Sequence, residues 1–244
     1  MPASPSKVAG AVKSGPMRSA TEKKVKGTIQ HFGQDMLKKV GSSDTFDINS
    51  KATKAFMKEF TGARINGITK VTQGRVAKIV EAGYDAGHST AKIAETLADK
   101  FDQWSEGRAF VMAKTEVNSA SNFGAWEGMA QAEVEKKEWL STQDDAVRET
   151  HEELDGTIVD LDEPFESSSG ATAQYPGDFG DPAEDVNCRC GVLPVVGDKH
   201  LVGSRAAMFK SLESERKPYD KLLWKGFKQG FQAQKRAVLA ALGG

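Results

Sequence analysis

Both cysteines of the chain and one of its four histidines fall into two short blocks, which hold the residue types best suited to chemistry. The first block carries His151 and ends in Leu154-Asp155-Gly156, and the second is Asn187-Cys188-Arg189-Cys190. An imidazole and two thiolates suit a tetrahedral zinc ion, and a carboxylate or a water can complete the set. The blocks therefore predict a structural zinc site at His151, Cys188 and Cys190, with Asp185, Asp145 or Asp155 as a fourth ligand.

The same residues also permit a site without a metal. His151 would then hydrogen-bond within the junction of strand and loop, and the two thiols would be packed or oxidised together. Two cysteines separated by one residue reach a single ion only in a tight turn, and a disulfide between them is strained. Both the metal site and the packed thiols stay open at this point.

The segment that carries these blocks is strongly acidic. Between Ser141 and Asn187 there are fourteen Asp or Glu residues and a single base, Arg148. We expect Arg148 to pair with Asp144, Asp145 or Asp155 and so to hold the two blocks together. Such a role is structural rather than catalytic.

The elements that must position these blocks change in type near residue 133. Apolar side chains at helical spacing predict helices over residues 20–40, 65–83, 89–104 and 108–132. Beyond them, residues 136–142, 157–161 and 191–196 have the composition of strands, and Pro194 places the third at a sheet edge or a strand end. Residues 163–186 form a long acidic loop, which needs tying down in a compact domain.

The two ends of the chain are basic. Residues 1–30 carry six Lys or Arg and one acid, and residues 199–244 carry ten and three. Residues 1–19 lack periodicity and predict a disordered tail, whereas residues 204–242 predict an amphipathic helix. Its basic face suits double-stranded DNA or an acidic protein surface; the residues are Lys217, Lys221, Lys225, Lys228, Lys235 and Arg236.

These observations predict an α+β protein with four consecutive parts. They are a disordered basic tail (1–19), a helical region (20–133), a β-containing module with the acidic loop (134–198) and a basic helical segment (199–244). No run of 18 apolar residues and no signal peptide is present, so we expect no membrane partner and synthesis in a reducing cytoplasm.

The order of motifs over residues 105–197 resembles the phage Mu F-like minor head proteins, also called head morphogenesis proteins. The resemblance rests on Arg108 to Glu116, Asn122-Phe123-Gly124, Trp139-Leu140-Ser141-Thr142, Leu154-Asp155-Gly156 and Asn187-Cys188-Arg189-Cys190. It implies a virion protein at the portal vertex or capsid interior, with the portal, scaffold or major capsid protein and packaged DNA as partners. The residues holding the module would be Trp139, Asp144, Arg148, His151, Asp155, Gly156, Asn187, Cys188 and Cys190.

Some positions depart from the family pattern. Arg148 and His151 stand where many members carry Cys-x-x-Cys, Asp185-Val186 replaces a His-Pro pair, and Lys114 replaces an Arg. Three possible metal ligands of the family's cysteine-rich set therefore remain in this chain, and they are His151, Cys188 and Cys190.

An enzyme is the alternative reading. His151-Glu152-Glu153 with a downstream cysteine pair is similar to the zinc deaminases, but those enzymes carry Pro-Cys-x-x-Cys on a helix. A metal-dependent nuclease using His151 with Asp144 and Asp145 is another form of this alternative. The resemblance to head proteins favours a chain without a catalytic residue.

Overall fold

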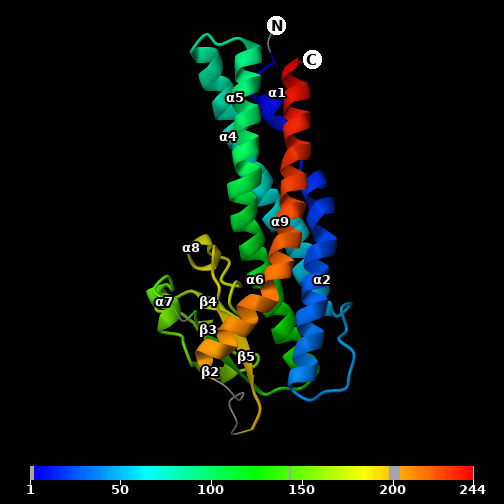
Figure 1. The fold of residues 1–244 in the computed structure, drawn as a ribbon, viewed down its shortest axis with the longest axis vertical. Coiled ribbons are helices and arrows are strands. Elements are labelled where there is room, and N and C mark those ends of the chain that lie inside the picture. The colour runs from blue at the N-terminus through cyan, green and yellow to red at the C-terminus, as the bar shows by residue number, and fades with distance from the viewer. Residues whose placement is uncertain (1–2, 143, 198–203, 244) are drawn as a thin grey trace. The chain divides into compact units, whose positions relative to one another are not determined.

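The chain folds into long helices and a small amount of antiparallel sheet, which confirms the α+β class (Figure 1). The structure, a computed structural model, describes residues 3–142, 144–197 and 204–243. The α-helices are α1 (Pro5–Gly10), α2 (Gly15–Lys39), α3 (Lys51–Glu59), α4 (Ile65–Asp85), α5 (Thr90–Gln103), α6 (Ala109–Gln131), α7 (Glu149–Glu152), α8 (Pro182–Asp185) and α9 (Arg205–Gly243). Two π-helical turns, η1 (Phe60–Arg64) and η2 (Trp104–Arg108), precede α4 and α6. The strands are β1 (Lys136–Leu140), β2 (Ile158–Asp160), β3 (Phe165–Glu166), β4 (Thr172–Ala173) and β5 (Gly191–Val195).

The chain divides into two compact units that are each assembled from non-consecutive segments. Unit 1 comprises Met1–Lys23, Lys54–Phe110 and Leu223–Gly244, and unit 2 comprises Lys24–Thr53 and Val111–Leu222. Because α2, α3, α6 and α9 contribute residues to both units, the division does not follow the consecutive parts that the sequence predicted. The predicted boundary at residues 198 and 199 lies outside the described residues.

Unit 1 contains the α4–α5 hairpin. The Ser89 side chain accepts a hydrogen bond from the backbone N–H of Lys92 at 3.2 Å, so Ser89 is the N-cap of the helix predicted over residues 89–104. Its apolar side chains Ile93, Leu97 and Phe101, which recur at helical spacing, are buried, and this confirms the spacing argument for α5.

The first residues differ from the disordered tail predicted over residues 1–19. Residues 5–10 form α1, Ser4 caps it, and Val8 and Val12 are fully buried in unit 1. The backbone carbonyl of Lys13 accepts a hydrogen bond from Gln234 at 2.9 Å. The content of Pro, Gly and Ser predicted disorder. The structure instead has a capped short helix with apolar side chains that are buried in the core of unit 1.

In unit 2, α2 and α6 pack closely at glycines. A Cβ atom on Gly124 would lie 2.7 Å from the backbone oxygen of Ile29, and one on Gly128 would lie 2.7 Å from that of Gly33. Residues without side chains at these positions let the two helix backbones approach each other. The stripe predicted on α2 is buried, and its members in unit 2 are Val25, Ile29, Phe32, Met36 and Leu37.

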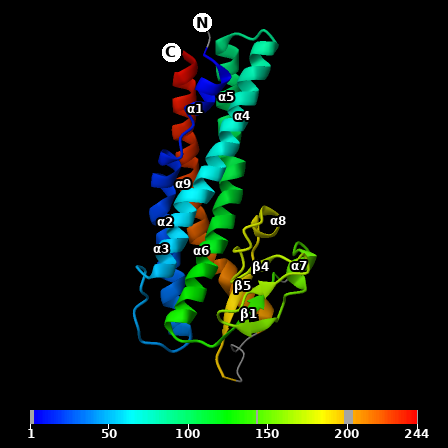
Figure 2. The ribbon, with the colours of Figure 1, turned by 180° about the vertical axis from the view of Figure 1, so that it is seen from behind.

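The sheet of unit 2 has the strand order β2-β1-β5 and is antiparallel throughout. Glu138 of β1 lies opposite Ile158 of β2 and Leu193 of β5, so the three strands that the sequence predicted pair with one another. The acidic loop is more ordered than predicted, because β3 pairs with β4 and α8 follows them. Figures 1 and 2 show α7 and α8 beside the strands, on the side away from α2.

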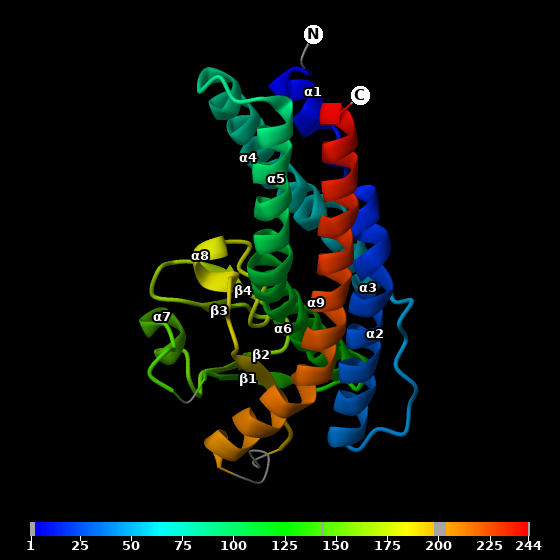
Figure 3. The same ribbon diagram turned by 45° about the horizontal axis from the view of Figure 1, so that its top comes forward.

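The C-terminal helix α9 is continuous through Pro218, and its first turns lie beside the sheet (Figure 3). A Cβ atom on Gly191 of β5 would collide with the Leu212 side chain of α9, so this contact is tight. Among the described residues, no helix combines the length and the apolar character that crossing a membrane requires.

Candidate metal centre

Pairing of β1 with β5 brings the two chemistry-bearing blocks together. His151 lies on α7, which follows β1, and Cys188 and Cys190 lie directly before β5. The turn after α7 is fastened to β1, because the N–H of Gly156 donates to the carbonyl of Trp139 at 2.9 Å. Asp155 Oδ1 accepts a hydrogen bond from the N–H of Ser141 at 2.7 Å. The Leu-Asp-Gly motif therefore holds the turn after α7 against the end of β1.

The imidazole and both thiols converge in the interior of unit 2. The Sγ atoms of Cys188 and Cys190 each lie 3.6 Å from Nδ1 of His151, and the three ligand atoms lie within 4.8 Å of one another. The three residues are at most 2% exposed, and both cysteines are free thiols. The structure therefore unites three of the four ligands that the sequence proposed.

Hydrogen bonds distinguish the two sulfurs. The pKa of the Cys188 thiol is raised well above its usual value by its hydrogen bond to Cys190 and by burial. The pKa of Cys190 is lowered well below its usual value, because Cys188, His151 and the backbone N–H of Thr142 all donate to its sulfur or attract its charge. The two thiols share one hydrogen bond and therefore titrate as a pair, and a cation bound between them would favour ionisation of both.

Glu184 completes the surroundings of His151 and was missed by the sequence analysis. Its Oε2 lies 3.1 Å from Nε2 of His151, at an angle outside that of a good hydrogen bond, and its carboxylate accepts from Ser169 at 2.8 Å and from Thr150 at 3.0 Å. Burial raises the pKa of Glu184, but these donors and His151 hold it below its usual value. A carboxylate behind the second ring nitrogen is the usual partner of a metal-binding histidine.

A small cavity adjoins the ligands. Its volume is about 10 Å³, which is close to the room that one water needs. Thr142 lines this cavity, and its buried hydroxyl has no hydrogen-bond partner among the described residues. The donor set of one imidazole and two thiols, with a single small ligand beside Thr142, fits a tetrahedral ion.

Asp185, the proposed fourth ligand, has a different position. Its carboxylate accepts from the N–H groups of Phe179 and Gly180 at 3.1 and 2.9 Å, and it is not part of the ligand cluster among the described residues. It thereby shapes the turn that stacks the Phe179 ring on His151, with 5.4 Å between ring centroids.

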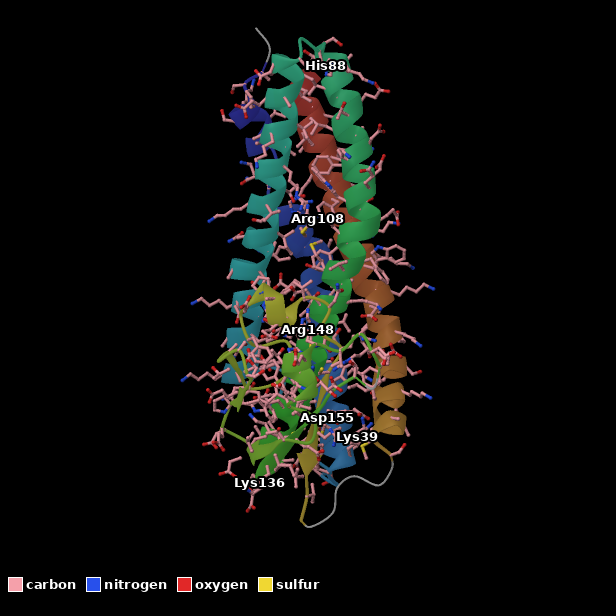
Figure 4. The ribbon with its side chains drawn as sticks, turned by 90° about the vertical axis from the view of Figure 1, so that its left-hand side faces the viewer. Lys39, His88, Arg108, Lys136, Arg148 and Asp155 are labelled. Carbon is pink, nitrogen blue, oxygen red and sulfur yellow. The ribbon has the colours of Figure 1, made fainter. Side chains whose placement is uncertain are left out.

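The ion pairs of the module also differ from those predicted. Arg148, at the start of α7, donates to the carbonyl of Val186 rather than to an aspartate, so it still joins the two blocks (Figure 4). Asp144 is held by Arg189 in two hydrogen bonds of 2.6 and 2.7 Å. Asp155, at the other end of α7, is held by Arg205 of α9, which reaches it at 2.6 Å.

Two more predicted module residues have structural positions. Trp139 is fully buried and packs its ring edge-to-face with His151 at 5.4 Å between centroids. Asn187 has a φ of 59°, which turns the chain just before Cys188, and its N–H donates to Thr115 of α6. Both residues shape the ligand pocket without entering the cluster.

The start of β5 is fastened by side chains of two helices. The amide of Asn122 on α6 donates to the carbonyl of Cys190 at 3.0 Å and accepts from the N–H of Val192 at 3.3 Å. Arg216 of α9 donates to the carbonyls of Arg189 and Cys190 and to the side chains of Asn122 and Ser121. Arg216 is 6% exposed, and burial lowers the pKa of its guanidinium to about 10.

Comparison with known proteins gives the same assignment as the motif order. Residues 74–193, from α4 to β5, match the family described as Phage Mu protein F like protein. Residues 74–193 are a region of the Mu F-like family. No solved structure matches the chain.

Three relatives are similar to parts of the chain. The chain is 30% identical over 124 residues to the minor head protein GP7 of Bacillus phage SPP1, covering 50% of the chain and 40% of GP7. It is 30% identical over 186 residues to the uncharacterized protein YqbB of Bacillus subtilis, covering 74% of the chain and 61% of YqbB. It is 37% identical over 125 residues to an Enterococcus faecalis protein named NAD(+)--arginine ADP-ribosyltransferase EFV, covering 50% of the chain and 25% of that protein. The chain thus spans less than two thirds of the length of each.

Proposed function

We propose that this Mu F-like protein is a minor head protein of a tailed phage that acts in head morphogenesis. The observation that carries the proposal is the match of residues 74–193 to the family, together with the similarity to the SPP1 minor head protein. The protein would be a virion component in the capsid interior or at the portal vertex. Its partners would be the portal, scaffold or major capsid protein.

The module would serve assembly as a zinc-stapled unit. His151, Cys188 and Cys190 hold the ion, Glu184 orients the imidazole, and the cavity beside Thr142 admits the fourth ligand. A bound zinc would supply a cross-link between α7 and the start of β5. Because metal binding of this kind is linked to folding, it would stabilise the acidic loop between them.

Contact with packaged DNA would use the basic face of α9. Lys217, Lys221, Lys225 and Arg236 are exposed, as non-specific contact with a polyanion requires. Lys228 and Lys235 instead form ion pairs with Glu106 and Asp102 within unit 1, so they are less available for DNA than the sequence predicted.

The enzyme alternative has less support. A metal-dependent hydrolase or deaminase needs an ion that substrate can reach, whereas the candidate ligands are at most 2% exposed and adjoin a cavity of about 10 Å³. The transferase name belongs to a protein of which the similarity covers 25%. We therefore propose no catalytic residue.

Head assembly tests the proposal directly. The chain would be produced with the portal, scaffold and major capsid proteins of its own phage, and procapsids purified by sedimentation. We expect the chain to co-sediment with procapsids and to be absent when the portal or the scaffold is omitted. Procapsids that form with normal yield and infectivity from a phage lacking this gene would overturn the proposal.

A further inference from the structure

Residues 60–80, which form η1 and most of α4, are a stretch of unit 1 without carboxylates; Glu81 and Asp85 follow at the end of α4. Between Phe60 and Val80 there are four cations and no Asp or Glu. The cations are Arg64, Lys70, Arg75 and Lys78. Arg64 pairs with Glu59 at 2.8 Å, which leaves Lys70, Arg75 and Lys78 as the other cations of this stretch.

Arg108 faces this stretch from the end of the π-helical turn η2. Its Nη1 donates to the hydroxyl of Thr72 at 3.3 Å, and its guanidinium carbon lies 5.7 Å from the ring centroid of Trp104 and 5.3 Å from that of Phe231. Figure 4 shows Arg108 between α4 and the helix that continues as α6. The extra residue in a π-helical turn often marks a functional position.

Arg75 shares the same aromatic ring. Its guanidinium carbon lies 5.9 Å from the Trp104 centroid, and it comes one helical turn after Thr72, the residue that Arg108 contacts. The charge of Arg75 and the burial of Arg108 together lower the pKa of Arg108 to about 10. Two like charges are thus held near one indole.

No protein carboxylate balances these two charges among the described residues. Two acids of α5 and η2 already pair with α9: Asp102 with Lys235, and Glu106 with Lys228. Arg75 is exposed, but Arg108 is half-buried, and a half-buried cation without a counter-charge is costly unless a ligand supplies it. Paired guanidinium groups match phosphate oxygens in two parallel hydrogen bonds each.

We propose that Arg75 and Arg108, held around Trp104, bind a phosphodiester group of nucleic acid. Lys70 and Lys78 are exposed on the same helix and would meet neighbouring phosphates, which a single small anion would not require. The site rests on the proposed contact with packaged DNA, but it lies in unit 1 and uses none of the predicted basic residues of α9.

Nuclear magnetic resonance of the arginine Nε–Hε groups tests the site in the full chain. Titration with inorganic phosphate should shift the signals of Arg75 and Arg108 and leave that of Arg64 in place. If neither signal moves with inorganic phosphate or with a short DNA duplex, the proposal is wrong. If inorganic phosphate moves them and the duplex does not, the nucleic-acid source is overturned.

Binding of a short DNA duplex at several salt concentrations gives the second measurement. Arg75→Gln should weaken binding about tenfold and reduce the log-log salt slope by about 0.9, the share of one phosphate. Arg108→Lys keeps the charge between the two rings and removes the paired hydrogen bonds, so it should fold normally and also weaken binding. The matched control is Lys92→Gln, because Lys92 is exposed on α5 and pairs with Glu95.

Equal affinity for the duplex in Arg75→Gln, Arg108→Lys and Lys92→Gln would overturn the site. Removal of the α9 cations by Lys217→Gln with Lys221→Gln separates this result from the proposed function. If that double variant loses DNA binding while the two arginine variants keep it, the further site fails and the contact through α9 stands. If the chain enters procapsids but none of the variants changes DNA binding, the head role stands and both DNA contacts fail.

Discussion

Replacing Glu184 by Gln tests whether the carboxylate serves a metal-binding histidine. The variant keeps the shape of the side chain, and one oxygen can still accept from Ser169. At the other oxygen, which lies 3.1 Å from Nε2 of His151, the new amide group would face the ring N–H as a second donor. Because Nε2 lies outside good hydrogen-bond geometry already, the change removes the attraction between the carboxylate charge and the ring rather than a hydrogen bond.

Loss of the carboxylate behind a metal-binding histidine lowers metal affinity roughly 10- to 100-fold in other metal sites, and we expect a loss of that size here. Competition with a chromophoric zinc chelator measures the affinity, and far-ultraviolet circular dichroism checks the fold. The control is Glu153→Gln, which removes the same charge from an exposed position beside α7.

We expect Glu153→Gln to bind zinc as the unaltered chain does. Equal zinc affinity in both variants would refute the role of Glu184. Zinc binding that is undetectable in the unaltered chain would refute the site itself. A Glu153→Gln variant that enters heads, yet yields no infectious particles, would contradict the structural interpretation of the module.

Three further predictions concern stability. Cys188→Ser should lower the melting temperature and make it insensitive to a chelator, because structural zinc binding adds to the free energy of folding; a chelator without effect on the unaltered chain would contradict this. Burial raises the pKa of Asp220 from 3.8 to about 6, so stability falls as pH rises from about 4 to about 6, and Asp220→Asn should raise stability to urea above pH 6 but not near pH 4. A gain of equal size at both pH values would show that the charge is not responsible. Gly124→Ala, whose Cβ would lie 2.7 Å from the Ile29 carbonyl, should cost about 1–3 kcal/mol in urea unfolding, whereas Gly67→Ala, with open space around it, should gain about 0.5–1 kcal/mol.

The three metal ligands were predictable because their residue types are rare in this chain and their chemistry is specific. Cys188, Cys190 and His151 differ in chemistry from their neighbours in the sequence. The strands predicted around them indicated that all three belong to one module. Glu184 could not be selected in the same way, since it is one of fourteen acids in its segment. Which carboxylate faces the imidazole of His151 depends on the folded conformation of the acidic loop.

Ion-pair partners were the least predictable part of the module. Arg148 was expected to meet an aspartate close in sequence, but Asp144 is held by Arg189 and Asp155 by Arg205. Those partners come from distant segments, and their choice depends on how β5 and α9 pack. A charge pattern along the chain does not contain that information.

Arg216 shows a signal that helical spacing did contain. The sequence analysis assigned it no role, yet it falls at helical intervals from Leu212 and Leu223, which belong to the apolar face of α9. Its buried position follows from that register. The same spacing rule correctly separated the exposed Lys217 and Lys221 from the core.

The Asn122 side chain has a consequence for how copies of this protein meet. Strand β5 is the edge of its sheet, and an open edge recruits strands from other chains, most of all at high concentration. Asn122 occupies the outward carbonyl of Cys190 and the outward N–H of Val192, and alternation along the strand places Pro194, which has no N–H, on the same side. We therefore expect copies crowded within a small volume to stay unaggregated along this edge, so that an ordered contact made through β5 must be specified by side chains rather than by shared β-structure.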